Sequence, residues 1–302
     1  MSENIEIIAD DRNRTGEGPI WDAANGRLLW TDIEGGLVYQ FVPATGEKTI
    51  LSRGLNVAGI ALNRTGELVC TTGEGLVLWR GQDDYRVLAS EHEGEALAFN
   101  DLIADARGRV YAGTYYWNAE NQMEKPGTLY LFGTDGSVRV VDEGVELANG
   151  LGFSPDGRTL YFSDSAARRI YAYDVQLETG ALSNKRVFVQ VPRNEGIPDG
   201  MTVDAEGFVW SAQWYGSQVV RYDPDGKVER RIAMPAQQVS SVAFGGPDLT
   251  DLYITTAGDS WVSGFAPPGY DFDAPNIGGA LYRIRIGIQG RPEPYADISS
   301  GE

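Results

Sequence analysis

The strongest constraint on the fold of this chain is a unit that occurs six times along its 302 residues. Each copy consists of a short apolar segment, a polar turn and an apolar or aromatic segment. A repeat must be found before single elements are assigned, because it decides how the elements stack. The six copies read PIWDAANGRLLWTDI, GIALNRTGELVCTTG, DLIADARGRVYAGTY, GLGFSPDGRTLYFSDS, GMTVDAEGFVWSAQW and SVAFGGPDLTDLYITTA.

The turns of these copies fix the period of the repeat. Successive turn glycines lie 40, 42, 49 and 50 residues apart, at Gly26, Gly66, Gly108, Gly157 and Gly207. The sixth turn, at residues 248–251, has no glycine at the matching place. Most copies are followed by two further strand-like segments, such as GLVYQFV and EKTILS. Four short strands every 40 to 50 residues are typical of a propeller blade, so the sequence predicts an all-β, six-bladed β-propeller forming a single domain over residues 1–302.

The two ends of the chain are predicted to meet in the last blade. The sixth copy is followed by GALYRIR but by no clear fourth strand, whereas IEIIAD at residues 5–10 precedes the first copy. We therefore expect the N-terminal strand to complete the last blade, which would remove two exposed sheet edges. The alternative closing strand is RPEPYADI, whose two prolines make it a poorer partner in a ladder.

Composition excludes several classes of partner. The 25 Lys and Arg residues against 43 Asp and Glu residues give a net charge of −18, which argues against nucleic acid or an anionic membrane surface. No apolar run approaches the roughly 20 residues of a membrane span. The start, MSENIEIIADDRNR, lacks the basic and apolar regions of a signal peptide. We expect a cytoplasmic protein that is a monomer or a weak homo-oligomer.

The chain has one cysteine, Cys70, and one histidine, His92. These counts exclude an intrachain disulfide, a cysteine metal cage and zinc sites built from several histidines. Cys70 is expected to be a small buried hydrophobe, and His92 a solvated loop residue. No GxSxG elbow, Walker A loop or GxGxxG fingerprint occurs. Any chemistry must therefore use oxygen ligands and carboxylates.

A ring of polar side chains is predicted at the mouth of the central channel. The innermost strand of each blade lines the channel, so equivalent positions in the six copies are related by rotation about its axis. The copies were aligned on the residue that opens the turn after each inner strand: Asp22, Asn63, Asp105, Ser154, Asp204 and Gly245. The residues five positions earlier are Glu17, Ala58, Asn100, Asn149, Asp199 and Ser240.

Two carboxylates and two amides converge in this ring. Each residue alone could be a turn-former at the start of a strand. Two neighbouring carboxylates repel each other unless a cation neutralises them, and a donor set of oxygens alone selects a hard ion. We therefore expect one divalent ion, with Ca²⁺ first, then Mg²⁺ or Mn²⁺, and Zn²⁺ as the less natural choice.

A resemblance to a known family is carried by GEGPIWD with LLWTDI, FNDLIADARGRVYAGT, ANGLGFSPDGRTLYFSDS and IPDGMTVDAEGFVWSA. These segments are similar to motifs of the SMP-30/gluconolactonase/luciferin-regenerating enzyme (regucalcin-like) family. The resemblance extends over about residues 5–297. It implies a six-bladed propeller with a divalent metal in the channel. The implied metal ligands are Glu17, Asn149 and Asp199, with Asn100 beside the metal as a ligand or a substrate contact.

The activity that this resemblance implies is hydrolysis of a sugar lactone, or a related lactone, to the hydroxy acid. The metal would polarise the lactone carbonyl and stabilise the oxyanion. By analogy with the family, Asp199 would be the general base and Glu17 a plain ligand. Two alternatives stay open: hydrolysis of phosphotriesters or aryl esters on the same metal, and a non-catalytic metal-binding propeller.

Two positions depart from the family pattern. Sugar-lactone members usually have an arginine where this chain has Ala98, and often a glutamate where it has Asn118. We therefore expect weaker selection for hydroxylated lactones, with aromatic side chains supplying contact area instead. Tyr115 and Trp261 are further rim candidates, and Tyr116 is expected to pack between blades. The predicted substrate contacts are Asn100, Asn118, Trp117 and Trp214.

Overall fold

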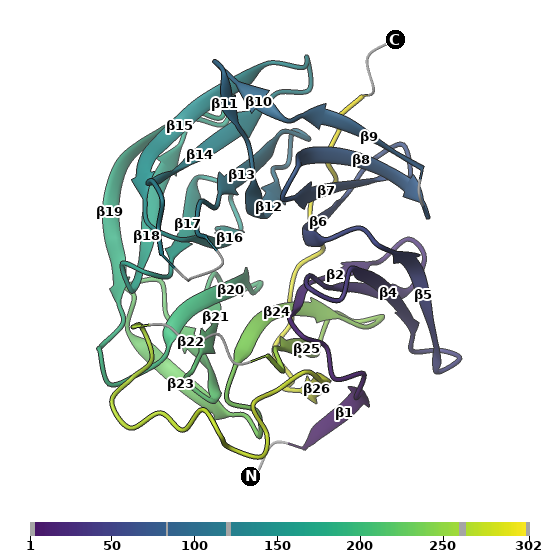
Figure 1. The fold of residues 1–302 in the computed structure, drawn as a ribbon, viewed down its shortest axis with the longest axis vertical. Helices are drawn as coiled ribbons and strands as arrows, with labels where there is room; N and C mark the ends of the chain where they lie inside the picture. The colour runs from purple at the N-terminus through teal and green to yellow at the C-terminus, as the bar shows by residue number, and fades with distance from the viewer. Residues whose placement is uncertain (1–3, 83, 119–121, 260–263, 300–302) are drawn as a thin grey trace.

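The computed structural model describes residues 4–82, 84–118, 122–259 and 264–299. Six antiparallel four-stranded sheets, the blades, follow one another around a central axis (Figure 1), as the repeat predicts. The described residues form strands and turns but no helix. Consequently, no helix in this part of the chain has the length and hydrophobicity to cross a bilayer.

The first three blades follow the order of the chain, and each runs from the axis outward. Blade I consists of β2 (Gly16–Asp22), β3 (Arg27–Asp32), β4 (Leu37–Val42) and β5 (Glu47–Arg53). Blade II consists of β6 (Val57–Leu62), β7 (Leu68–Thr72), β8 (Gly75–Gly81) and β9 (Asp84–Ala89). Blade III consists of β12 (Phe99–Ala104), β13 (Val110–Thr114), β14 (Gly127–Phe132) and β15 (Val138–Val145).

The other three blades complete the ring. Blade IV consists of β16 (Ala148–Phe153), β17 (Thr159–Asp164), β18 (Arg169–Val175) and β19 (Leu182–Gln190). Blade V consists of β20 (Ile197–Val203), β21 (Val209–Trp214), β22 (Gln218–Tyr222) and β23 (Val228–Ala233). Blade VI consists of β24 (Val239–Gly245), β25 (Asp251–Thr256), β26 (Leu281–Arg285) and the N-terminal strand β1 (Ile5–Ala9).

The pairing of β1 with β26 confirms the predicted closure. The two strands are antiparallel, and Ile5 lies opposite Ile284. An ion pair of 2.5 Å joins Glu6 to Arg283 across the same ladder. β1 is therefore the outermost strand of blade VI, although it is the first strand of the chain.

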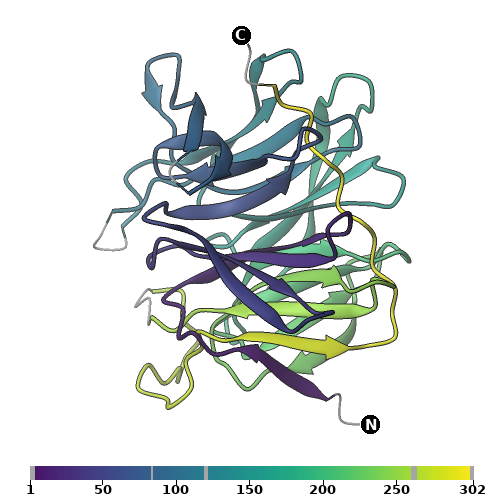
Figure 2. The same ribbon diagram turned by 90° about the vertical axis from the view of Figure 1, so that its right-hand side faces the viewer.

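The segment of residues 286–299, here called the C-terminal strap, takes no part in this closure. Figure 2 shows it running along one face of the ring, on the side opposite the long loop between β25 and β26. Its backbone and side chains form hydrogen bonds with five of the blades, VI, V, IV, III and II, at Leu249, Ala205, Phe153, Gly108 and Leu62. The strap covers the end of the channel that lies away from the predicted ring.

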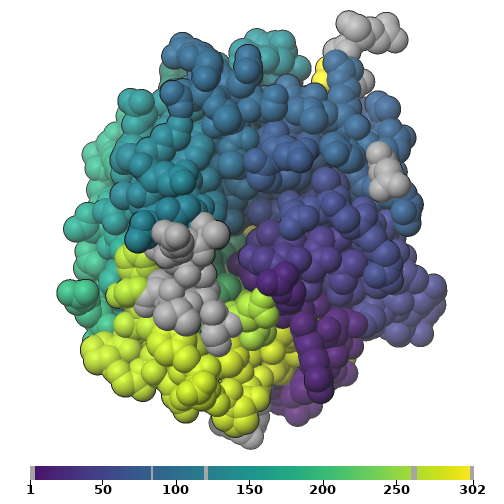
Figure 3. Space-filling model, viewed as in Figure 1, coloured from purple at the N-terminus to yellow at the C-terminus, as the bar shows by residue number. Residues whose placement is uncertain are grey.

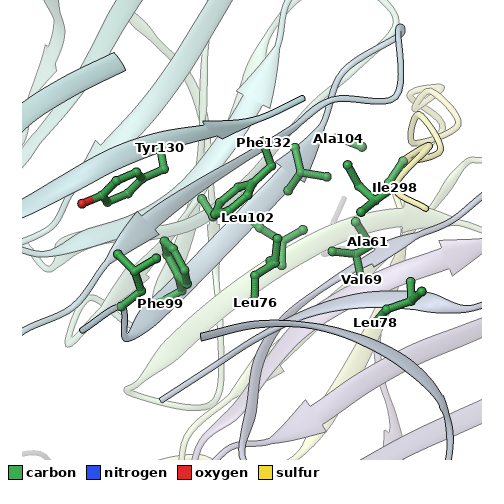
Figure 4. Packing of buried hydrophobic residues seen from close by; sticks show 14 residues of the cluster. Ala61, Val69, Leu76, Leu78, Phe99, Leu102, Ala104, Tyr130, Phe132 and Ile298 are labelled. Carbon is green, nitrogen blue, oxygen red and sulfur yellow. The ribbon is translucent and has the colours of Figure 1, made fainter. Parts of the chain in front are cut away.

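The hydrophobic core lies between neighbouring blades because successive strand residues face opposite sides of a sheet. In β13, Val110 and Ala112 pack toward blade II, whereas Tyr111 packs toward blade IV. Figure 4 shows the cluster between blades II and III, which Ile298 of the strap also joins. Each blade therefore packs against both of its neighbours. Full burial of one large apolar side chain in such a cluster stabilises the fold by roughly 1.5–3 kcal/mol.

The lone cysteine and the lone histidine lie away from the channel mouth. Cys70, in β7, is buried as expected, and burial raises the pKa of its thiol. His92 lies in a short extra hairpin of β10 (Glu91–His92) and β11 (Glu95–Ala96). Its half-buried ring meets Tyr130 edge-on, with 5.4 Å between the ring centroids. The expectation of a solvated loop at His92 was therefore wrong, because the segment pairs as a hairpin, with His92 opposite Glu95, and the ring is half-buried.

Candidate functional site

The predicted ring residues lie where the innermost ladder of each blade is irregular. The pairing between the first and second strands slips around Ala58, Asn100, Asn149, Asp199 and Ser240, and directly after Glu17. A bulge of this kind re-aims a side chain away from the regular ladder. In a regular strand, successive side chains alternate between the two faces of the blade and pack in the core. The irregular step lets the ring side chain leave this alternation.

Five of the six ring residues line one cavity of about 560 Å³ at the mouth of the channel: Glu17, Ala58, Asn100, Asn149 and Asp199. The sixth, Ser240, is buried and donates a hydrogen bond of 2.5 Å to the carbonyl of Gly16. Figure 3 shows this face of the molecule, with the yellow-green loop between β25 and β26 lying beside the purple N-terminal residues.

Glycines after two ring positions let the inner strands approach closely. A Cβ atom on Gly200 would lie 2.0 Å from Oγ of Ser241, on the next blade. A Cβ atom on Gly150 would lie 2.5 Å from the backbone nitrogen of Met201. The inner strands of blades IV, V and VI can therefore meet only because these positions carry no side chain, and this approach draws Asn149 and Asp199 together.

A chain of hydrogen bonds orients the two amides. Nδ2 of Asn100 donates to the carbonyl of Ala148 at 2.8 Å and to Oδ1 of Asn149 at 3.2 Å. Nδ2 of Asn149 donates to Oγ of Ser165 at 3.1 Å, and this hydroxyl donates to the carbonyl of Pro198 at 2.6 Å. Since the amide nitrogens are engaged with the protein, Oδ1 of Asn100 and the second lone pair of Oδ1 of Asn149 are the acceptors left to a ligand.

Burial, and then repulsion between neighbouring carboxylates, raises the pKa of the carboxyl groups in the channel. Desolvation, followed by the charges of Asp199 and Asp101, holds the pKa of Glu17 well above its usual value. Desolvation and the charge of Asp101 do the same to the pKa of Asp199. Deeper in the channel, burial raises the pKa of Asp101 to about 6 and also raises that of Glu293 in the strap. The ring therefore concentrates negative charge that the protein compensates poorly.

A hard cation fits this donor set. Oδ1 of Asp199 is buried without a hydrogen-bond partner among the described residues, and a cation would supply one. In that same part of the chain, no three His, Cys, Asp or Glu side chains form a metal-binding group. A cation at the ring would therefore depend on the amide oxygens of Asn100 and Asn149 beside the carboxylates of Glu17 and Asp199.

The remaining wall of the cavity comes from segments that the ring alignment did not consider. They precede the inner strands or follow the second strands, and both kinds of segment lie at the end of the channel where the cavity is. The residues are Arg14, Thr15, Asn56 and Leu147 before inner strands, and Ile33, Glu34, Gly73, Tyr115, Trp214 and Asp259 at or after the ends of second strands. Phe99 and Ile197 also line the cavity. The repeat could have located six of these positions, because Thr15, Asn56 and Leu147 directly precede an inner strand and Ile33, Gly73 and Tyr115 directly follow a second strand. Arg14 and Asp259 occur at no such repeated place.

The predicted substrate contacts fall into two groups. Asn100 and Trp214 line the cavity, and the buried indole Nε1 of Trp214 has no hydrogen-bond partner among the described residues. Trp117 and Asn118 lie in the connection from β13 to β14 and are not among the described lining residues. Nε1 of Trp117 donates to the carbonyl of Glu146 at 2.8 Å, and Oδ1 of Asn118 accepts from the backbone of Gln122 at 3.0 Å. Substrate contact by these two residues stays a prediction.

The other rim aromatics are divided as well. Tyr115 lines the cavity, and desolvation raises the pKa of its hydroxyl to about 12. The hydroxyl of Tyr116 donates to the carbonyl of Ala96 at 2.8 Å. Trp261 lies outside the described residues.

Glu17→Gln is expected to stabilise the metal-free protein, by about 1–3 kcal/mol, because it removes a desolvated charge. A carboxyl whose pKa is raised by folding favours the folded state at low pH and loses that contribution as pH rises through the folded pKa. The difference in melting temperature between the variant and the wild type, measured in chelator, should therefore grow from pH 5 to pH 8. Added Ca²⁺ should reverse the order of stability. A variant that melts below the wild type in chelator at pH 8 would contradict the charge argument.

Comparisons with known proteins agree with this architecture. Residues 15–258 match the family described as SMP-30/Gluconolactonase/LRE-like region. A pentonolactonase, XacC, of Haloferax volcanii is 40% identical over 297 residues, covering 98% of this chain and 99% of that protein. Regucalcin of Gallus gallus is 33% identical over 303 residues, covering 97% of this chain and 98% of that protein. The crystal structure of a regucalcin from Agrobacterium tumefaciens, described as a calcium-binding protein, has a TM-score of 0.84 at 26% identity and covers 98% of both chains.

Proposed function

Because the chain belongs to the SMP-30/gluconolactonase/LRE-like family, we propose that it is a hydrolase that opens lactones in the cavity at the channel mouth. The observation that carries this proposal is the convergence of two carboxylates and two oriented amide oxygens on a cavity of about 560 Å³. Support for the lactone comes from the relative named as a pentonolactonase, which is similar over almost the whole chain.

The proposed ligands of a divalent cation are Glu17, Asn149 and Asp199, with Asn100 as a fourth oxygen donor or a substrate contact. When bound, such an ion would neutralise the carboxylates and polarise the lactone carbonyl. The ion we propose first is Ca²⁺, since the donors are all oxygens. The calcium-binding relative in Agrobacterium supports the same choice.

The general base we propose is Asp199. Its carboxylate lines the cavity and would accept a proton from a water molecule, while the water oxygen bonds to the lactone carbonyl carbon. The bond from that carbon to the ring oxygen then breaks, and the proton passes to the leaving oxygen. The product is the open-chain hydroxy acid. Asn100 and Asn149 would hold the cation through their amide oxygens, and Tyr115 and Trp214 would exclude bulk water.

Lactone turnover and its dependence on a metal test this proposal together. Purified protein should hydrolyse a lactone series that runs from gluconolactone through pentonolactones to substituted butyrolactones, as measured by acid release. Chelator should abolish turnover, and Ca²⁺ should restore it. A phosphotriester and an aryl ester measured beside the lactones separate the related hydrolase activities. Absence of turnover on every lactone, in protein whose melting temperature rises with Ca²⁺, would instead support a non-catalytic metal-binding propeller.

A further inference from the structure

Arg14 is the one cationic side chain among the described residues that line the cavity. It lies directly before β2, three residues from Glu17 in the sequence. The family pattern has an arginine at the place of Ala98, on blade III, whereas Arg14 approaches the same cavity from blade I. The structure therefore supplies a charged donor that the sequence comparison of positions 98 and 118 did not reveal.

The backbone of Arg14 is anchored by a buried carboxylate. The backbone nitrogen of Arg14 donates to Oδ2 of Asp32 at 3.1 Å, and that of Thr15 donates to Oδ1 of the same side chain at 2.9 Å. Asp32 ends β3 and also accepts from Gly35 at 3.2 Å. These bonds tie the segment before β2 to the second strand of blade I, so the position from which the Arg14 side chain extends is fixed.

The guanidinium of Arg14 is held between two blades. Its Nε donates to Oδ2 of Asp259 at 2.6 Å, and its Nη1 donates to the carbonyl of Glu34 at 3.2 Å. Asp259 follows β25 of blade VI, and Glu34 follows β3 of blade I. A guanidinium has five N–H donors, so these two bonds orient the group and leave further donors for a ligand in the cavity.

The three side chains together match a polyhydroxylated ring. Each hydroxyl both donates and accepts, so it can accept from the guanidinium of Arg14 and donate to the carboxylate of Asp259 or Glu34. A site built from such partners discriminates against analogues that lack the hydroxyl, because its polar groups are then left without partners. Two carboxylates beside one arginine also disfavour a substrate with a carboxylate of its own.

We propose that Arg14, oriented by Asp259 and Glu34, contacts the ring hydroxyls of the substrate and selects neutral hydroxylated lactones. This inference rests on the proposed lactonase function and gives its substrate class. It also reverses the expectation drawn from Ala98 and Asn118, since that expectation assumed that no charged donor reaches the cavity.

The experiment compares Arg14→Ala with the wild type on a pentonolactone and on unsubstituted γ-butyrolactone. We expect kcat/KM for the pentonolactone to fall about 10- to 100-fold, mainly through KM, because a charged hydrogen bond to the bound substrate is lost. For γ-butyrolactone the change should stay within about twofold. Asp259→Asn, which weakens the orientation of the guanidinium, should give a smaller loss on the pentonolactone alone.

The matched control is Arg107→Ala. Arg107 forms an ion pair of 2.6 Å with Glu178 and has a side chain 51% exposed, against 56% for Arg14. It lies outside the cavity and should leave both substrates unaffected. The rise in melting temperature with Ca²⁺ should be the same in all variants, which shows that the metal site is intact.

Three results would overturn the inference. They are an equal loss on both lactones, no loss on either, or a wild-type preference for the lactone without hydroxyls. In each of these cases the wild type still hydrolyses lactones, so the proposed function survives. Failure of the wild type on every lactone would instead overturn the proposed function itself.

Discussion

Replacing Asp199 with asparagine should lower kcat by roughly 10²- to 10⁴-fold, the usual effect of losing a general base. The exchange keeps the shape of the side chain but removes its charge and its ability to accept a proton. Asp199 is 3% exposed, and its pKa is raised by burial, so the uncharged variant should fold at least as stably as the metal-free wild type. The measurement is kcat at saturating lactone and saturating Ca²⁺.

Measurement at saturating Ca²⁺ separates the two proposed roles of Asp199, metal ligand and general base. A fall in kcat that came only from weaker metal binding would disappear at saturating Ca²⁺. The matched control is Glu293→Gln, which also removes a desolvated channel carboxylate but lies in the strap, at the opposite end. It should keep kcat within about threefold. If Asp199→Asn retained more than about a tenth of the wild-type kcat, the assignment of the base would be wrong.

Removing residues 1–10 should destabilise the whole ring. Ile8 and Ala9 pack into the core between blades VI and I, and Ile5 packs against the core of blades V and VI. Loss of these contacts should cost roughly 3–6 kcal/mol. At about 2 °C per kcal/mol for a chain of this size, the melting temperature should fall by about 6–12 °C. The unpaired edge of β26 should also promote aggregation, measured as loss of soluble protein.

The control for this truncation is removal of residues 1–3 alone, which leaves β1 complete. Its melting temperature should match that of the full chain. If the chain without residues 1–10 were equally stable, the pairing of β1 with β26 would contribute little to closure.

The fold was predictable because it repeats. Each blade must bury two apolar faces, so short segments that are buried throughout, such as β13, recur with every copy, and six copies leave few arrangements. Even the pairing of β1 with blade VI could be predicted, because the sixth copy lacks a clear fourth strand of its own. The course of the C-terminal strap could not be predicted in this way. Its contacts are isolated hydrogen bonds, such as that from Asp297 to Gly108, and single apolar side chains such as Ile298, and no periodic pattern marks them.

The candidate site was predictable to the extent that it obeys the same rotation. The alignment selected Glu17, Asn100, Asn149 and Asp199, and the structure brings all four to one cavity. Arg14 was missed because it bonds to Asp259, which lies 245 residues away. A contact of this kind cannot be predicted from the neighbouring sequence, since the loops of blades I and VI meet only when the ring is closed. The irregular ladder steps that re-aim the ring residues are also invisible in the apolar pattern.

The C-terminal strap also changes how the blades depend on one another. In most repeat proteins each unit touches only its neighbours, and units at an end can unfold separately. Here the last described residues of the chain bind blades that are not adjacent, such as II, IV and VI. Loss of any one of these blades would release an attachment of the strap, and with it a link between the others. Six similar sheets are thereby linked beyond the contacts between neighbours, and we expect them to unfold together.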